Sequence, residues 1–260
     1  MGQVSFSKWS PGGNTTVFLP FSSQSGTDPA LCAFLQSSEM LCAEQLGYVD
    51  TEKKRLFMSG GEFCLNASRA FGALLDLERP TRQRSYTMSV SGLDDPVQVD
   101  VTGDCPDYCC TARLPLAADS LIRLDRDACL VRLPGISHLL LPCAGGRPPD
   151  NPARLAGHLR RQHGLEACDA CGVVWWRGGR RPRIWPLVHV RATGTDYLEN
   201  SCGSGSLALA LALAGSSGAS LEIEQPGGSL LACQVAPQGD AWQASIGGPV
   251  RLVAKGAVWF

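Results

Sequence analysis

The sequence predicts an α+β fold in which two similar halves each combine short strands with a few helices. The first observation behind this prediction is a repeated motif, Cys-x-[Asn/Ser]-[Ala/Gly]-Ser, at residues 64–68 and again 138 residues later at 202–206. Both copies lead into apolar runs that favour a buried helix. The second observation is a helix start of the form Asp/Asn-Pro-Ala in each half, at Asp28 and at Asn151. A duplicated unit with a join near residues 115–120 accounts for both observations.

The first half opens with a predicted hairpin. The stretch QVSFSKW alternates apolar and polar residues, and NTTVFL follows the turn Pro11-Gly12-Gly13. The acidic cap and proline at Asp28-Pro29 start a helix that we expect to run towards Gly47. A helix follows Cys64. Strands are expected around it, near residues 55–59, 86–91, 97–102 and 108–114.

The second half repeats this order of elements. Asn151-Pro152 starts a helix that Gly164 can end. After Cys202, Leu and Ala alternate without any β-branched residue, so we expect a fully buried helix opening near Gly203 rather than a strand. Strands are expected near 128–133, 136–141, 172–176 and 184–191, and in SLEIE, SLLACQV, AWQASI and VRLVAKGAVWF.

Charge and hydropathy narrow the classes of function. The formal net charge of −1 gives no electrostatic reason to expect nucleic acid or an anionic membrane as a partner. The opening residues lack the basic and apolar segments of a secretion signal. The most apolar stretch, Leu207 to Ala214, is too short to span a bilayer. We therefore expect a soluble cytoplasmic protein.

The chain contains twelve cysteines. Without a secretion signal, we expect reduced thiols rather than a disulfide framework. Most of them are expected to be small buried hydrophobic residues. The examples with apolar neighbours are Cys32, Cys42, Cys129, Cys143 and Cys233.

Thiols at two helix amino ends suggest a specific chemistry. The free N–H groups and the helix dipole at such an end lower the pKa of a thiol and bind anions. If two such ends flanked one substrate, one thiolate could remove a proton from a carbon while the other thiol returned one to the opposite face. The backbone N–H groups could hold a carboxylate and stabilise the carbanion. The alternative is a pair of structural cysteines that cap helices.

Other site types fit the sequence less well. Gly203-x-Gly205-x-x-Ala208 matches the dinucleotide fingerprint loosely, but no apolar strand runs into its first glycine. A zinc site would need a second cysteine pair to match Cys168 and Cys171, and the cluster at 105–110 is irregular. No lysine has the setting of a pyridoxal Schiff base. Among the histidines, His138 at the edge of an apolar strand is the most interesting.

Several longer motifs resemble the diaminopimelate epimerase superfamily. They are the two cysteine motifs with FSKWSPGGN, HLLLP, QPGGSL and IGGPVRLVAKG, and they occur in the family's order from end to end. Within that superfamily the chain looks most like the histidine racemases that serve opine-type metallophore synthesis. The motifs that carry this likeness are KWSPGGNTT, AEQLGYV, MSGGEFCLNAS, VSGLDDPVQ, YLENSCGSGS and QPGGS.

The resemblance implies two similar halves, each a curled, mostly antiparallel sheet wrapped around a central helix, with the active site in the cleft between them. The first half would span 1–117, with the final strand 250–260 returning to it, and the second 118–249. It also implies a two-base mechanism without cofactor or metal, in which Cys64 and Cys202 are the catalytic pair. The substrate-binding residues would be Asn14, Glu44, Leu65, Asn66, His138, Glu199, Gly203 and Ser204.

The departures from the family pattern concern the substrate. Diaminopimelate epimerases carry an arginine for the distal carboxylate before the second cysteine, and RATGTDYLENSC has none aligned there. Leu65 also replaces the usual glycine after the first cysteine, where its side chain could reshape the pocket. The expected reaction is therefore interconversion of L- and D-histidine. The expected partner is a small amino-acid substrate, and the protein could form a homodimer. The alternatives are another amino-acid epimerase on this fold, or a non-catalytic cysteine-rich metal-binding or interaction protein.

Overall fold

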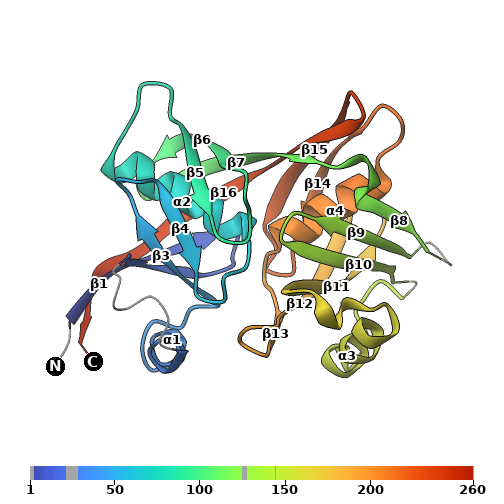
Figure 1. Ribbon diagram of the computed structural model, residues 1–260, viewed down its shortest axis with the longest axis horizontal. Coiled ribbons are helices and arrows are strands. Elements are labelled where there is room, and N and C mark those ends of the chain that lie inside the picture. The colour runs from blue at the N-terminus through green and yellow to red at the C-terminus, as the bar shows by residue number, and fades with distance from the viewer. Residues whose placement is uncertain (1–2, 22–28, 125–127, 144, 260) are drawn as a thin grey trace. The chain divides into compact units, whose positions relative to one another are not determined.

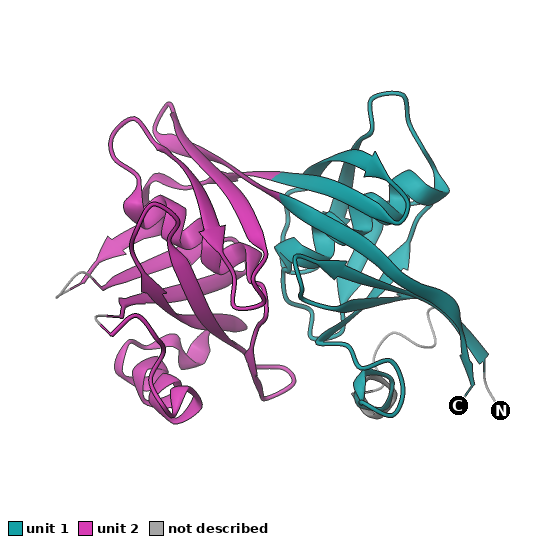
Figure 2. Ribbon diagram, turned by 180° about the vertical axis from the view of Figure 1, so that it is seen from behind, with its two compact units in different colours: residues 1–112, 248–260 teal, residues 113–247 magenta. Residues whose placement is uncertain are grey.

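The computed structural model describes residues 3–21, 29–124, 128–143 and 145–259. The chain divides into two compact units, which Figure 2 shows in different colours. Unit 1 contains residues 1–112 and 248–260, and unit 2 contains residues 113–247. The chain therefore leaves unit 1 once and returns to it with its last residues.

Unit 1 is a sheet that closes on itself. Its strands follow the order β1-β2-β3-β4-β5-β6-β7-β16, and β16 also pairs with β1. The elements are β1 (Gln3–Pro11), β2 (Thr16–Pro20), α1 (Pro29–Gln36), β3 (Gln45–Asp50), β4 (Arg55–Met58), α2 (Leu65–Glu78), β5 (Ser85–Val90), β6 (Val97–Asp104), β7 (Asp107–Leu116) and β16 (Ala241–Trp259).

Unit 2 continues the strand order as β16-β15-β14-β12-β11-β10-β9-β8, with β13 paired to β12. Its other elements are η1 (Ala118–Ser120), β8 (Leu121–Arg123), β9 (Cys129–Leu133), β10 (Ile136–Pro142), α3 (Pro152–Gln162), η2 (Leu165–Ala167), β11 (Ala170–Arg177), β12 (Arg183–Val190), β13 (Thr195–Leu198), α4 (Gly203–Leu213), β14 (Ala219–Glu224) and β15 (Leu230–Gln238).

Each unit buries one helix that begins directly after a cysteine (Figure 1). Helix α2 packs against β1, β5 and β6, and α4 packs against β9, β10, β14 and β15. Gly72 permits close approach in unit 1, since a Cβ there would lie 2.5 Å from Val99 Cγ1. In α4, every residue from Gly203 to Ala212 is buried, which suits a run of Leu and Ala with no polar face. The predicted helix start near Gly203 is confirmed.

Most predicted elements are confirmed, but the helix expected from Asp28 to Gly47 is wrong beyond its first turns. Asp28 lies outside the described residues, and α1 ends at Gln36. The chain then turns, with Cys42 at a φ of 46°. Residues 45–50 instead form β3, parallel to β2, where Leu46 and Tyr48 are completely buried. Pairing with β2 buries both side chains, and this outweighs the local preference for helix.

Two further differences concern strands. The segment AWQASI and residues 250–259 of VRLVAKGAVWF, which we expected as separate strands, lie in the single strand β16. The short strands β8 and β13 have no clear signal in the sequence. Because they pair with β9 and β12, their extended form depends on partners supplied by the fold.

The prediction that most cysteines are buried is also wrong. Cys129 and Cys233 are buried, but Cys143 is partly exposed and Cys42 is exposed. Cys42 occupies the turn after α1, where a side chain meets solvent whatever its apolar neighbours in sequence. The side chain of Cys32 lies outside the described residues.

The described residues offer neither a membrane-spanning helix nor a cluster of metal-binding side chains. None of the described helices is long and apolar enough to cross a membrane. In the same part of the chain, no group of three or more His, Cys, Asp or Glu side chains could hold a metal ion.

Candidate functional site

The predicted site residues fall into two groups, one in each unit. Asn14, Glu44, Cys64, Leu65 and Asn66 belong to unit 1. The residues of unit 2 are His138, Glu199, Cys202, Gly203 and Ser204.

Cys64 is the N-cap of α2. Its sulfur accepts a hydrogen bond from the Ala67 amide at 3.4 Å, and its carbonyl accepts from the Ser68 hydroxyl at 2.8 Å. A cap of this kind satisfies one of the free amides of the first helical turn. The cysteine motif therefore has a local structural role: its sulfur, small residues and final serine together begin the helix.

The thiol of Cys64 also donates to Gln45 Oε1 at 3.2 Å. Gln45 is the first residue of β3, and its side-chain oxygen accepts a second hydrogen bond from the Thr16 hydroxyl at 3.3 Å. Gln45 was not predicted as a site residue, although it lies in the motif AEQLGYV. Gln45 gives Cys64 a fixed partner outside its own helix.

Three predicted binding residues of unit 1 lie close to these contacts along the chain. The Glu44 amide donates to the Thr15 hydroxyl at 3.1 Å, which ties the start of β3 to the turn after β1. Asn14, in the same turn, is completely buried. Leu65 is 1% exposed, so its side chain is part of the core. The turn after β1 and the start of β3 thus form one structure beside the cysteine end of α2.

Cys202 is the N-cap of α4 and repeats the geometry of Cys64. Its sulfur accepts from the Gly205 amide at 3.3 Å, and its carbonyl accepts from the Ser206 hydroxyl at 2.7 Å. Gln225 binds both parts of this cap, because Oε1 accepts from the Cys202 amide at 2.9 Å and Nε2 donates to the Ser206 hydroxyl at 2.8 Å. Gln225 is completely buried. It lies in the motif QPGGSL but was not predicted as a site residue.

Ser204 connects the thiol of unit 2 to a buried histidine. Its hydroxyl lies 3.6 Å from Cys202 Sγ and 2.8 Å from His138 Nε2. Burial lowers the pKa of His138 to about 3, because the charged imidazolium would lose its hydration. The imidazole is therefore neutral at physiological pH. Its hydrogen bond with the Ser204 hydroxyl joins two uncharged groups.

The surroundings of Cys202 favour its protonated thiol. Burial raises the pKa of Cys202 well above 9, and the charge of Glu199 and its hydrogen bond to the thiol add to this. The Ser204 hydroxyl and the Gly205 amide act in the opposite direction but do not reverse the shift. The thiol is therefore the favoured form of Cys202 at physiological pH.

A substitution at Gly172 tests the position of His138. Gly172 on β11 pairs with His138 on β10, and a Cβ at Gly172 would lie 2.3 Å from His138 Nδ1. Gly172→Ala must displace a fully buried ring from Ser204. We expect the free energy of unfolding to fall by about 1–3 kcal/mol and kcat/KM to fall with it. Gly145→Ala is the matched control, because nothing lies within 4 Å of its Cβ. Urea unfolding and steady-state kinetics measure both effects, and equal behaviour of the two variants would contradict this account.

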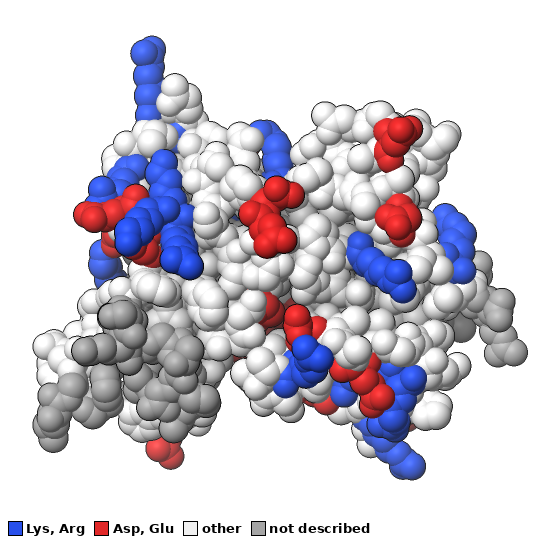
Figure 3. Space-filling model, in the orientation of Figure 1, with Lys and Arg blue, Asp and Glu red and all other residues white. Residues whose placement is uncertain are grey.

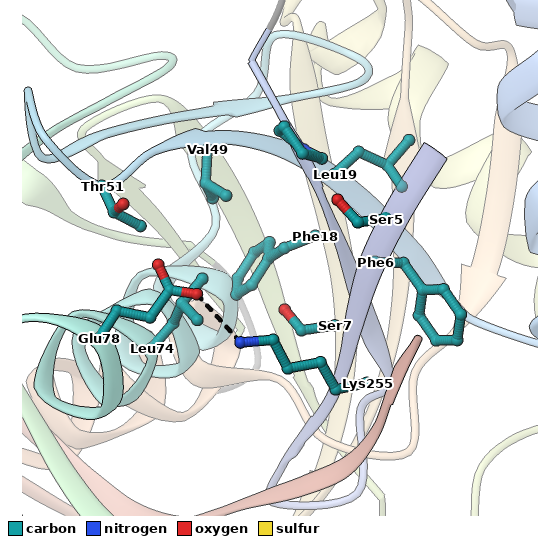
Figure 4. A pocket seen from close by; sticks show the side chains of 11 residues that line it. Ser5, Phe6, Ser7, Phe18, Leu19, Val49, Thr51, Leu74, Glu78 and Lys255 are labelled. Atoms are coloured by element: carbon teal, nitrogen blue, oxygen red, sulfur yellow. Dashed lines mark hydrogen bonds and ion pairs between the residues drawn. The ribbon is translucent and has the colours of Figure 1, made fainter. Parts of the chain in front are cut away.

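The hollow shown in Figure 4 lies elsewhere on unit 1. It has a volume of about 150 Å³ and includes the ion pair of Glu78 and Lys255, whose charged atoms are 3.3 Å apart. Glu78 is the last residue of α2, whereas Cys64 precedes its first. None of the predicted site residues lines this hollow. On the face in Figure 3, basic and acidic side chains are interspersed.

The family model and the curated relatives carry the same description. A family model described as "Histidine racemase CntK N-terminal domain" matches residues 3–259. Curated histidine racemases from Fusobacterium nucleatum and Staphylococcus aureus are 28% and 24% identical to the chain, and the alignments cover 98% of it and 96% and 97% of those proteins. A phenazine biosynthesis protein of the PhzF family from Bacillus anthracis has a similar fold, with a TM-score of 0.66, 12% identity and full coverage of both chains. Because the family model spans nearly the whole sequence, the chain belongs to the histidine racemase family that it describes.

Proposed function

We propose that this isomerase interconverts L- and D-histidine by proton transfer at the α-carbon, with Cys64 and Cys202 as the two acid–base groups. The observation that carries the proposal is the pair of equivalent caps. Each unit presents one thiol at the amino end of a buried helix, held by the third residue after it. The family membership and the names of the curated relatives support histidine as the substrate.

The reaction needs only groups that the chain supplies. One cysteine, as thiolate, takes the α-proton, and the electron pair of the C–H bond moves into the α-carbon and its carboxylate. The other cysteine, as thiol, gives a proton to the opposite face, so the two roles exchange when the direction reverses. The amides at the two helix ends and the Asn66 side chain would bind the carboxylate and stabilise its added charge. No cofactor or metal takes part.

The unit 2 residues suit the donor step. Cys202 begins as a thiol, and Ser204 provides it with a polar neighbour that is itself held by neutral His138. Once Cys202 has lost its proton, the Gly205 amide and the Ser204 hydroxyl are available to stabilise the thiolate. Glu199 opposes that charge, which favours rapid return of a proton to Cys202.

The imidazole would be recognised in unit 1. Glu44 lies beside Gln45, the partner of Cys64, and its carboxylate would accept a hydrogen bond from an imidazole N–H. The segment before Cys202 has no arginine aligned for a distal carboxylate, which would be costly to bury without a partner. The D-histidine formed would serve opine-type metallophore synthesis.

We further propose that the two halves are counterparts, with boundaries near residues 117 and 249. Each would be a curled sheet around its central helix and would contribute one thiol. The burial of α2 and α4, and their contacts with strands of the same unit, support this description.

A panel of L-amino acids tests the proposed function. In D2O with EDTA, we expect L-histidine to be converted to D-histidine that carries deuterium at the α-carbon, because an exchangeable thiol delivers the new hydrogen. Diaminopimelate should react more slowly, and Glu44→Gln should lower kcat/KM for histidine. Chiral chromatography with mass spectrometry measures each product. Faster turnover of diaminopimelate would establish the rival epimerase, and loss of activity in EDTA would contradict the metal-free mechanism.

A further inference from the structure

Arg69 is a completely buried arginine in the helix that carries Cys64. Its Nη2 donates to Asn66 Oδ1 at 2.8 Å, and this hydrogen bond is itself buried. Side chains of a helix lean towards its amino end, and Asn66 lies three residues earlier, so the guanidinium reaches back to the first turn of α2. A permanent positive charge therefore lies beside the helix end that begins with Cys64.

Packing alone does not explain an arginine at this position. The equivalent residue of the second cysteine motif, five positions after Cys202, is Leu207, which is also completely buried. A leucine is therefore enough to fill the corresponding place in α4. Burying a guanidinium costs far more free energy than burying a leucine, unless its charge and its donors are used.

The hydrogen bond to Arg69 determines which way the Asn66 amide points. A guanidinium has only donors, so the amide must present its oxygen to Arg69. The NH2 group lies at the other end of the planar amide and faces away from the guanidinium. Asn66 is thereby held as a donor in the first turn of α2, where the helix dipole already favours an anion.

We propose that Arg69 is a positioning residue that fixes Asn66 as a donor to the α-carboxylate of the substrate. This inference rests on the proposed function only in requiring an α-amino acid substrate, since it does not involve the substrate's side chain.

The neighbouring thiol of Cys110 does not cancel the positive charge of Arg69. Burial raises the pKa of Cys110 to about 12, although Arg69 lowers it, so this thiol remains neutral.

A double-mutant cycle tests the role of Arg69. Asn66→Ala should lower kcat/KM about 10- to 100-fold, mainly through KM, because one oriented hydrogen bond to a charged group is lost. Arg69→Met should cause a loss of similar size in the wild-type background and little further loss in the Asn66→Ala background. Arg69→Lys, which can still donate to Asn66, should retain more activity than Arg69→Met. Arg84→Met is the matched control, because Arg84 also binds a side chain of α2, Asp76, at the other end of the helix.

The outcomes separate this inference from the proposed function. The cycle is run with whichever amino acid of the panel is turned over, so failure on histidine contradicts the proposed substrate alone. Losses that multiply in the double variant, or full kcat/KM in folded Arg69→Met, would overturn the role of Arg69. If Arg69→Met does not fold, the same cycle with Arg69→Leu, the residue found at the equivalent position of α4, decides by the same criterion. Arg84→Met should leave KM within about twofold of the wild-type value, as expected for a change without a shared partner.

Discussion

We expect Cys64→Ala and Cys202→Ala each to abolish racemisation, with a loss larger than the roughly 10²–10⁴-fold usual for one acid–base group. Inversion needs a proton removed from one face of the α-carbon and another delivered to the opposite face. Each variant lacks one of these two groups, and neither Ala67 nor Gly205, which contact the sulfurs, offers a replacement. Chiral chromatography of product formed from L-histidine and from D-histidine measures the loss in both directions.

Suitable controls are Cys109→Ala in unit 1 and Cys233→Ala in unit 2, which remove thiols outside the proposed site. Both should keep wild-type turnover, and circular dichroism should show that all four variants are folded. Substantial racemisation by Cys64→Ala or Cys202→Ala would show that the two-thiol mechanism is wrong. That cysteine would then be a helix cap and nothing more.

The second large effect is a loss of stability in acid caused by His138. Its pKa is about 3 in the folded protein and about 6.5 when unfolded. Between these values the unfolded chain binds a proton that the native state does not, so the free energy of unfolding decreases as pH falls from 6.5 towards 3. Above pH 6.5 the imidazole is neutral in both states, so His138 no longer makes the free energy of unfolding depend on pH. Between pH 6.5 and 3 the decrease due to His138 sums to about 5 kcal/mol, at roughly 1.4 kcal/mol per pH unit.

Urea unfolding of the wild-type protein and of His138→Gln at pH 7.0, 5.5 and 4.5 measures this effect. Glutamine keeps a polar group near Ser204 but does not titrate, so the variant should lose less stability on acidification than the wild type. The relevant quantity is the difference between the two proteins in how steeply the free energy of unfolding falls with pH, since carboxylates contribute equally to both. An identical fall in both proteins would mean that the buried imidazole does not cause the loss of stability in acid.

Much of the candidate site could be predicted because the cysteine motifs act locally. The contacts of Cys64 with Ala67 and of Cys202 with Gly205 span three residues, so motif and geometry coincide. The partners Gln45 and Gln225 could not be predicted in this way, because they lie 19 and 23 residues away from the cysteines along the chain. No local pattern distinguishes these glutamines from others, and only the fold brings them to the helix caps.

The sequence by itself determined the start of α2, α3 and α4, because caps depend on a few neighbouring residues. Asn151, for example, accepts from the Arg154 amide at 3.2 Å and begins α3 as predicted. The tertiary structure decided the features that depend on distant partners. It made residues 45–50 a strand, since pairing with β2 buries Leu46 and Tyr48. It also set the protonation of His138 and Cys202, because the pKa of each follows from burial that no local pattern specifies.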